Sequence, residues 1–318
     1  MKTRSLLIIG GTGFFGKSIL KYLSINKTTS IKINKIFILS RGKLKLGIYN
    51  KKLKKKFKII KINSNILTLK KLPIVDYVIY AAILKNYKDD HKAVKKYLDL
   101  AKKYHLKSKI LYISSGAVYG KQANSTLGFK ENYLQFNNKI SFKKGYKKEY
   151  SKIKLKNEKL FKKFGKIGGN VSIARCFSFV GEFLPRNSQY VVGDFIKNVL
   201  DNQNLNIKAG YQVIRSYMHE EDLVRWLLKI LSFSNQYCLT YNVGSDDIIS
   251  IHNLASLLVK KYNLNIDCSN IQMSKNILDK YIPNIHKAEK KLKLKNNYNS
   301  LNAIIKTINL LKKNEKTN

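Results

Sequence analysis

The chain has 318 residues, of which 44% are hydrophobic and 11% aromatic, which is enough for one large or two moderate domains with a substantial core. Its formal net charge of +43 comes overwhelmingly from lysines spread over the whole length, which favours a composition-wide bias over a localised nucleic-acid-binding patch. No apolar run approaches the roughly 20 residues that span a bilayer. We therefore expect a cytoplasmic globular protein with neither a membrane nor a nucleic acid as its partner.

The residue types that are scarce in this chain are informative. The three cysteines form no C-x-x-C pair, so the sequence indicates neither a disulfide framework nor a zinc site, and we expect no metal. Because lysine is the default cation here, an arginine marks a place that needs a planar, bidentate side chain. The six arginines are Arg4, Arg41, Arg175, Arg186, Arg215 and Arg225.

A glycine-rich stretch near the start organises the chain. The apolar residues Leu6–Ile9 are typical of a buried strand and lead through clustered glycines into a helical pattern that reaches about Ser24. Gly11, Gly13 and Gly16 satisfy G-x-G-x-x-G, which permits a tight turn, close approach of the backbone to a pyrophosphate, and packing of the helix on the strand. The start of the helix would then face the phosphates. The stretch predicts a dinucleotide site.

The second predicted strand, Lys35–Gly42, bears on the choice of cofactor. A dinucleotide fold that prefers NAD usually has a carboxylate at the end of this strand, yet no Asp or Glu occurs before Asp76. Ser40, Arg41 and Lys43 stand there instead, which suits a 2′-phosphate and favours NADP over NAD. The alternative is that Arg41 stacks on adenine or faces solvent.

Further strands and helices alternate along the first half of the chain. Apolar runs predict strands at 57–62, 74–82 and 109–120. Asp89–His105 has one apolar face and predicts a helix. This alternation predicts an α/β fold with a doubly wound parallel sheet of the Rossmann type, in which ligands bind at the carboxyl ends of the strands. Ser114 and Ser115 lie at such an end.

Tyr150 and Lys154 stand four residues apart in the helix-like segment Glu149–Phe161, which puts both side chains on one helix face. A phenol with a pKa of about 10 is a poor base at neutral pH, but a nearby lysine and an oxidised nicotinamide would stabilise the phenolate. Such a tyrosine can take a proton from a sugar hydroxyl as hydride leaves the same carbon, while a serine hydroxyl orients the oxygen. Ser115, Tyr150 and Lys154 are therefore the candidate catalytic residues.

Together these motifs resemble the extended short-chain dehydrogenase/reductases, the NAD-dependent epimerase/dehydratase family that acts on nucleotide sugars. The glycines that match the family's fingerprint are Gly10, Gly13 and Gly16. Residues 114–120, Ser-Ser-Gly-Ala-Val-Tyr-Gly, match its serine segment, and Tyr150 and Lys154 match its Tyr-x-x-x-Lys. The resemblance covers nearly the whole chain.

The resemblance implies roles for more residues and a setting in surface-polysaccharide precursor synthesis. The residues that it assigns to the cofactor are Gly10, Gly13, Phe14, Phe15, Gly16, Ser40, Arg41, Ala81, Ala82, Tyr150 and Lys154. Ser178 stands where many members carry an Asn near the sugar diphosphate, and Arg215 where an Arg holds the nucleotide phosphate. Family members are often homodimers through two helices, here Asp89–His105 and Tyr150–Phe164.

We expect an NAD(P)-binding Rossmann domain over residues 1–175 and a smaller mixed α/β substrate domain over 176–318, with some segments crossing back to the first. In the C-terminal part, the patterns predict helices at 191–200, 219–231, 251–262 and 301–311 and a short strand at 205–208. Three aromatic residues there could stack on a base, but burial habits favour the core for them. They are Phe177, Trp226 and Tyr241.

The residues after Ser115 bear on the reaction. Family members that dehydrate the sugar usually place Asp-Glu there, to protonate the departing C6 hydroxyl and to remove the C5 proton. Gly116 and Ala117 occupy these positions and cannot transfer a proton. We therefore expect a nucleotide-sugar 4-epimerase or 4-keto reductase. The alternatives are a 4,6-dehydratase whose acids come from elsewhere, such as Glu131 or Glu182, and a non-catalytic relative that binds NADP or RNA.

Overall fold

The computed structural model describes residues 4–136, 146–186, 190–207, 209–267 and 274–315. The chain forms two compact units, here called unit 1 and unit 2. Unit 1 comprises Met1–Gly120, Phe142–Cys176 and Val224–Val243, and unit 2 comprises Lys121–Ser141, Phe177–Leu223 and Gly244–Asn318. The sequence led us to expect a boundary after residue 175. In the structure, residues 121–141 belong to unit 2 and residues 224–243 belong to unit 1.

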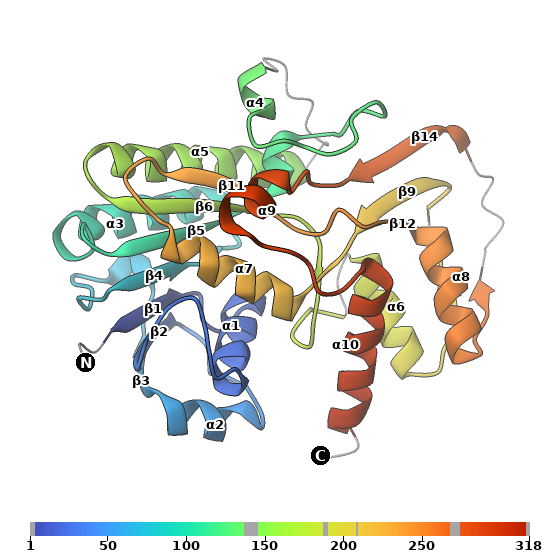
Figure 1. Cartoon of the computed structure of the whole chain (residues 1–318), viewed down its shortest axis with the longest axis horizontal. Coiled ribbons are helices and arrows are strands. Elements are labelled where there is room, and N and C mark those ends of the chain that lie inside the picture. The colour runs from blue at the N-terminus through green and yellow to red at the C-terminus, as the bar shows by residue number, and fades with distance from the viewer. Residues whose placement is uncertain (1–3, 137–145, 187–189, 208, 268–273, 316–318) are drawn as a thin grey trace. The chain divides into compact units, whose positions relative to one another are not determined.

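Unit 1 is built on a sheet that has seven strands within the described residues, in the order β11-β6-β5-β4-β1-β2-β3 (Figure 1). The strands are β1 (Ser5–Ile9), β2 (Lys35–Ser40), β3 (Lys58–Asn63), β4 (Tyr77–Tyr80), β5 (Lys109–Ser115), β6 (Asn170–Cys176) and β11 (Leu239–Val243). Neighbouring strands of this sheet pair in parallel. The strand order reverses between β1 and β4, where a doubly wound sheet binds its ligand. The prediction of a doubly wound parallel sheet is confirmed.

Helices cover both faces of this sheet. They are α1 (Phe14–Ile25), α2 (Tyr49–Lys56), α3 (Tyr87–Tyr104), α5 (Tyr146–Lys166) and α7 (Glu220–Ser232), with short 3-10 helices η1 (Ile66–Thr68) and η2 (Gly116–Tyr119). Figure 1 shows α3 and α5 along one face of the sheet and α1 along the other. The sequence patterns did not predict α2, because only Tyr49 and Leu53 of its lysine-rich residues are buried.

Unit 2 contains shorter strands and a helical core. Its helices are α4 (Tyr133–Phe136), α6 (Val191–Leu200), α8 (Ile251–Tyr262), α9 (His286–Leu292) and α10 (Ser300–Glu315). Its strands are β7 (Phe179–Val180), β8 (Leu205–Asn206), β9 (Tyr211–Ser216), β10 (Met218–His219), β12 (Ile248–Ser250), β13 (Ile266–Asp267) and β14 (Ser274–Tyr281). Apolar side chains of α6, α8 and α10 share one buried cluster. In the described residues, β9 lies between antiparallel β12 and parallel β14.

Several predictions for the C-terminal part can be compared with this structure. The predicted helices at 191–200 and 251–262 are confirmed at both ends. The strand expected at 205–208 has only two residues, and Lys208 lies outside the described residues. Phe177, Trp226 and Tyr241 are buried, as their assignment to the core predicts.

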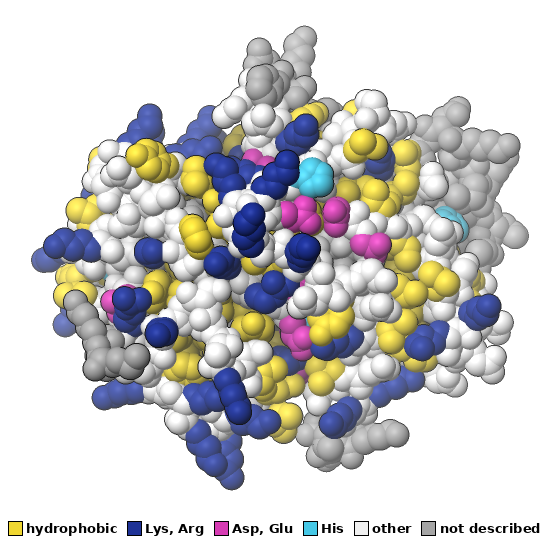
Figure 2. Space-filling model, in the orientation of Figure 1, with side chains coloured by type: hydrophobic (Ala, Val, Ile, Leu, Met, Phe, Trp, Pro, Cys, Tyr) yellow, Lys and Arg dark blue, Asp and Glu magenta, His cyan; other side chains and the backbone are white. Residues whose placement is uncertain are grey.

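Basic side chains are spread over the face in view and do not gather into one continuous patch (Figure 2). Figure 2 shows lysine and arginine side chains scattered over that face, between uncharged and apolar side chains. In the part of the chain that the structure describes, no helix combines the length and the apolar character needed to cross a membrane.

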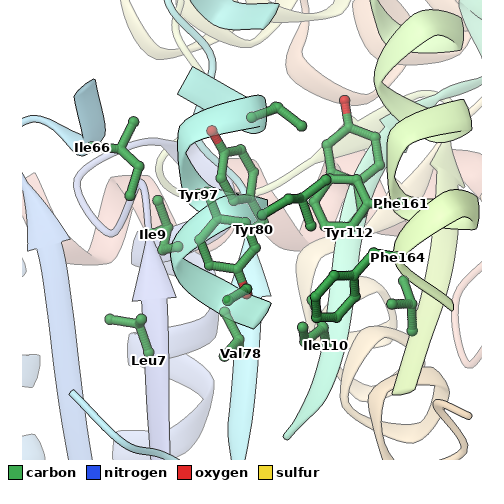
Figure 3. Close-up of a cluster of buried hydrophobic side chains, with 14 of the residues drawn as sticks. Leu7, Ile9, Ile66, Val78, Tyr80, Tyr97, Ile110, Tyr112, Phe161 and Phe164 are labelled. Atoms are coloured by element: carbon green, nitrogen blue, oxygen red, sulfur yellow. The ribbon is translucent and has the colours of Figure 1, made fainter. Parts of the chain in front are cut away.

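An aromatic core holds α3 and α5 on the sheet (Figure 3). Tyr80 of β4, Tyr112 of β5, Tyr97 of α3 and Phe161 of α5 are all fully buried. The rings of Tyr112 and Phe161 stack with their centroids 4.4 Å apart, and the Tyr80 ring lies 5.1 Å from that of Tyr97. Large buried rings in such contacts contribute both area and specific geometry. They fix where the polar residues on the inner faces of α3 and α5 lie.

Candidate functional site

The glycine turn between β1 and α1 is closely packed against the loop that follows β4. Gly10 has φ +91°, and a Cβ on it would lie 2.7 Å from the main-chain nitrogen of Ala82. A Cβ on Gly16 would lie 2.4 Å from the Cα of Gly11. Only glycine fits at Gly10 and Gly16. The turn and the predicted cofactor residues Ala81 and Ala82 therefore lie together.

The start of α1 has the features of an anion site. Gly13 is the N-cap and is exposed, and it has no side chain of its own to cap the helix. The first turn, which includes Phe14 and Phe15, contains no acidic residue. The backbone N–H groups and the dipole at a helix start attract anions such as a pyrophosphate. The glycine cradle and the exposed glycine N-cap fit a dinucleotide.

Ser40 and Arg41 lie at the end of β2, beside the glycine turn. Ser40 is only 7% exposed, and its hydroxyl has no hydrogen-bond partner among the residues that the structure describes. Arg41 is exposed. A Cβ on Gly42 would lie 3.8 Å from Oγ1 of Thr12 in the glycine turn. Cationic and hydroxyl donors, rather than a carboxylate, therefore border this side of the turn.

Ser115, Tyr150 and Lys154 come together at the carboxyl end of β5. Ser115 ends the strand, is 8% exposed, and accepts a hydrogen bond from the Ala117 main-chain nitrogen at 3.2 Å. Lys154 of α5 donates to the main-chain oxygen of Ile113 at 3.1 Å. Its Nζ lies 6.0 Å from the centroid of the Tyr150 ring. The structure thus brings these three residues together, and their catalytic role stays a prediction.

The Lys154 ammonium is buried, with 5% of the residue exposed. Burial lowers its pKa, and the nearby Asp90 carboxylate opposes that change. The Nζ also lies 5.1 Å from the centroid of the Tyr112 ring, whose negative face attracts a cation. A lysine in these surroundings holds its proton less firmly than one in water.

A second buried network lies one turn further along α5. Glu158 binds Arg175 of β6 through two close contacts, Nη2 to Oε2 at 2.7 Å and Nε to Oε1 at 3.0 Å. The Ser114 hydroxyl donates to the same carboxylate at 2.6 Å. The Arg175 guanidinium lies 4.7 Å from the ring centroid of Tyr119, whose hydroxyl donates to Asn242. Because Ser114 directly precedes Ser115 and Tyr119 is the last residue of η2, this network fixes the backbone around Ser115.

The sequence analysis missed most members of these networks. Glu158, Asp90 and Asn157 carry no local motif that separates them from other polar helix residues. Arg175 had a signal, because it is one of only six arginines, and its bidentate contact with Glu158 bears out that reasoning. A buried ion pair persists only when its remaining hydrogen-bonding groups are also satisfied.

Ser178 and Arg215, the predicted substrate residues, belong to unit 2. The main-chain oxygen of Ser178 accepts from the Met218 nitrogen at 3.1 Å, next to the pair of β7 and β10. Arg215 of β9 is bound by Asp279 of β14, through Nη2 to Oδ2 at 3.0 Å and Nη1 to the main-chain oxygen at 2.7 Å. A phosphate at Arg215 would have to share this guanidinium with the carboxylate.

The other residues considered for chemistry lie as follows. Glu131 and Glu182, the candidate relocated acids, belong to unit 2, and Glu182 accepts from the Asn314 amide at 2.9 Å. Cys176 and Cys238 are free thiols in the core, and Cys268 lies outside the described residues. Among the residues that the structure describes, no three His, Cys, Asp or Glu side chains are grouped to hold a metal ion.

Comparison with known proteins gives a family and a fold. The family model described as "NAD dependent epimerase/dehydratase family" matches residues 6–244. A comparison with curated proteins found no match. The chain is similar to the solved structure of a dTDP-glucose 4,6-dehydratase from Bacillus anthracis in complex with NAD, with 16% identity and a TM-score of 0.76 over 99% of this chain and 98% of that one. It is also similar to the structure of a UDP-glucose 4-epimerase from Thermotoga maritima with UDP-glucose, with 17% identity and a TM-score of 0.76 over 99% of this chain and 100% of that one.

A third solved structure of similar fold is a UDP-N-acetylglucosamine 4-epimerase from Methanobrevibacter ruminantium in complex with UDP-N-acetylmuramic acid. It shares 20% identity with a TM-score of 0.75, and the match covers 100% of this chain and 99% of that one. At such identities, the likeness to these three structures establishes the fold. It extends over both units of the chain.

The glycine turn predicts that Gly13→Ala separates cofactor binding from folding. A Cβ at Gly13 would lie 3.6 Å from the Gly10 oxygen, an ordinary contact, so we expect a loss of stability of no more than about 1 kcal/mol from the poorer N-cap. The methyl would occupy the space that a pyrophosphate needs, so affinity for NADH and NADPH should fall about tenfold or more. Thermal unfolding and fluorescence titration measure the two effects.

Two further variants control this experiment. Gly42→Ala, whose new Cβ meets only an ordinary contact, should keep both stability and affinity, whereas Gly16→Ala should lose stability because of the 2.4 Å contact. Wild-type cofactor affinity in Gly13→Ala would contradict the assignment of the turn as the pyrophosphate site.

Proposed function

Because the chain belongs to the NAD-dependent epimerase/dehydratase family, and is on that ground an enzyme with a nicotinamide cofactor, we propose that it acts at C4 of a nucleotide-activated sugar, as a 4-epimerase or a 4-keto reductase. The observation that carries the proposal is the grouping of Ser115, Tyr150 and Lys154 at the end of β5, with Gly116 and Ala117 directly after the serine. Solved structures of similar fold include nucleotide-sugar epimerases and a dehydratase, which supports the substrate class.

Each of the three side chains would have a distinct task. The Tyr150 phenol would exchange a proton with the C4 oxygen of the sugar, and the Lys154 ammonium beside its ring would stabilise the phenolate. The Ser115 hydroxyl accepts from the Ala117 nitrogen, so its own proton can be donated to the same C4 oxygen. The bound nicotinamide would accept or supply hydride at C4.

The residues around Ser115 favour C4 chemistry over dehydration. Loss of water across C5 and C6 needs an acid for the leaving hydroxyl and a base for the C5 proton. Gly116 and Ala117 form the first turn of η2 and carry no titratable group. A 4,6-dehydratase would therefore need acids from another part of the chain, such as Glu131 or Glu182.

Ser178 and Arg215 are our proposed substrate-binding residues, with Arg215 at the nucleotide diphosphate. A planar guanidinium suits a phosphate because it can donate two parallel hydrogen bonds. The Asp279 contact supports a prepared rather than a freely moving guanidinium, since Arg215 is bound both to the side chain and to the main chain of that residue. Side-chain exposures of 19% for Arg215 and 17% for Asp279 leave the pair partly accessible.

We also propose that the preferred cofactor is NADP(H). The support is the buried Ser40 hydroxyl without a described partner, the exposed Arg41 next to it, and the lack of any acidic residue before Asp76. A 2′-phosphate would satisfy the hydroxyl and pair with the guanidinium. A 2′-hydroxyl, in contrast, would find no carboxylate to accept its proton.

A homodimer through α3 and α5 stays a prediction from the family resemblance. Both helices expose several lysines along their length. Among the described side chains they are Lys88, Lys92, Lys95, Lys102, Lys103, Lys148, Lys152, Lys156, Lys159, Lys162, Lys163 and Lys166. An interface formed by these helices would bring like charges together, so ions or acidic partners must offset their repulsion.

Replacing Tyr150 by phenylalanine tests the proposed chemistry. We expect turnover of UDP-glucose, dTDP-glucose or UDP-N-acetylglucosamine, whichever the wild type converts, to fall about 10²- to 10⁴-fold, because the proton-transfer group is gone. Cofactor affinity should stay within about twofold, because only a hydroxyl is removed. Tyr237→Phe, on an exposed residue, is the matched control. A wild-type rate in Tyr150→Phe would exclude this mechanism.

The NADP preference predicts that wild type binds NADPH at least about tenfold more tightly than NADH. Arg41→Ala should then weaken NADPH binding about ten- to a hundredfold, the value of a charge-assisted hydrogen bond, and leave NADH binding unchanged. Lys55→Ala removes an exposed positive charge from α2 and should change neither affinity. Fluorescence titration measures all of them. Equal affinities of wild type for the two cofactors would overturn the preference.

A further inference from the structure

Asp90 is a buried carboxylate on the inner face of α3, with only 1% of the residue exposed. Its Oδ1 accepts from the main-chain nitrogen of Leu84 at 2.9 Å, and its Oδ2 accepts from the Asn157 amide at 3.1 Å. Both donors are uncharged. A carboxylate in such surroundings needs a nearby positive charge to offset its desolvation.

Asn157 links Asp90 to the helix that carries Lys154. It is fully buried on α5, three residues after Lys154 and therefore on the same helix face. Its Oδ1 lies 2.6 Å from Nδ1 of His91, so the ring donates to that oxygen and the amide group must face Asp90. The orientation of Asn157 is therefore set, and α3 and α5 are joined through it.

Three acidic groups act on Lys154, and two of them cannot balance its charge. Glu158 is already paired with Arg175 and bonded to Ser114. Cys176 is a neutral thiol, because burial raises its pKa far above the ordinary value. Asp90 has no guanidinium of its own among the described contacts, and although burial raises the pKa of its carboxyl, Lys154 opposes that change. Its charge is therefore available to Lys154.

The loop after β4 depends on the same carboxylate. Leu84, which donates to Asp90, follows Ala81 and Ala82, and Ala82 packs against the glycine turn. One side chain thus bonds the loop predicted to touch the cofactor and, through Asn157, the helix that carries Tyr150 and Lys154. Loss of Asp90 would affect both.

We propose that Asp90 is a positioning residue of the site, whose carboxylate balances the Lys154 ammonium and ties the loop after β4 to α5. The proposal rests on the proposed function, in which Lys154 acts at the cofactor and at Tyr150. Asp90 acts through Lys154 and is not itself a catalytic residue. Nothing in the local sequence marks it, because its partners lie 67 positions away in Asn157 and six in Leu84.

The charge balance has a consequence for pH. The ionisable groups that face Lys154 are Asp90 of α3, Tyr150 and Glu158 of α5, Tyr112 of β5 and Cys176 of β6. Further ionisable groups interact with these neighbours: His91 and Tyr87 of α3, Tyr80 of β4 and Arg175 of β6. Asp90 raises the pKa of Lys154 against the effect of burial. Without that carboxylate, Lys154 should lose its proton at lower pH, and the charge that strengthens its proposed hydrogen bonds to the cofactor should be lost with it.

The test compares variants that differ in charge but little in shape. Asn157→Ala keeps the Asp90 carboxylate. The neutral variant, Asp90→Asn with Asn157→Ala, replaces that carboxylate by an amide, and its second substitution removes the Asn157 amide that would otherwise face the new one. Asp90→Asn with Asn157→Asp exchanges the two groups, so the carboxylate moves to α5 and the bonds to Leu84 and His91 can still form. NADPH and NADH affinities are measured by fluorescence across roughly pH 6 to 10, with Lys154→Met to assign the inflection.

We expect the cofactor affinity of the wild type to fall as the pH rises, with an inflection at alkaline pH that is absent from Lys154→Met. In Asn157→Ala and in the exchange variant, Asp90→Asn with Asn157→Asp, the pH of this inflection should stay within about half a unit of the wild-type value. In the neutral variant, Asp90→Asn with Asn157→Ala, the inflection should move about one pH unit or more lower. An unmoved inflection in the neutral variant, or an equal shift in the exchange variant, would overturn the proposal. A wild-type protein that binds cofactor without a Lys154-dependent inflection would do the same.

Two further outcomes are distinguishable from these. If the neutral variant does not fold, the exchange variant decides alone: a wild-type inflection supports the proposal, and an inflection lowered by about one unit overturns it. If wild type binds neither NADPH nor NADH, the proposed function itself fails, and the role of Asp90 fails with it.

Discussion

The cost of burying the Lys154 ammonium is the constraint on which the candidate site in unit 1 depends. Taking an isolated ammonium out of water costs several kcal/mol in a protein interior. Three neighbours offset that cost: the Ile113 carbonyl, the Tyr112 ring and the Asp90 carboxylate. These neighbours come from β5 and α3, and Lys154 itself comes from α5. The site is therefore complete only when α3 and α5 both lie on the sheet. The stacked rings of Tyr112 and Phe161 show that the aromatic core which positions these helices also borders the site.

The parts of the fold and the site that could be predicted are those with a local signature. The glycine turn has one because a positive φ at Gly10 and close packing at Gly16 admit no side chain. Tyr150 and Lys154 have one because helical spacing puts residues four apart on one face. Parallel strands buried on both faces are nearly continuous apolar runs, which is why most strands of unit 1 could be located.

The rest required the tertiary structure. Asp90 and Asn157 are separated by 67 positions, and each is an unremarkable polar residue in a lysine-rich helix until the two helices meet. Arg215 shows the same limit in unit 2: its residue type suggests a phosphate, but the carboxylate that holds it lies 64 positions away in Asp279. Polar partners of this kind are chosen by geometry between elements, and no period in the sequence reports them.

In the proposed function, proton transfer at the site is confined to the C4 oxygen, because Ser115 is followed by Gly116 and Ala117. The most direct measurement is to incubate the enzyme in D₂O with NADPH, NADP⁺ or NAD⁺ and with UDP-glucose, UDP-N-acetylglucosamine, dTDP-glucose and their 4-keto derivatives. Mass spectrometry and NMR then locate deuterium in the product. Chemistry at C4 alone predicts a product with no solvent deuterium on carbon. A dehydrated product with deuterium at C5 would contradict the account.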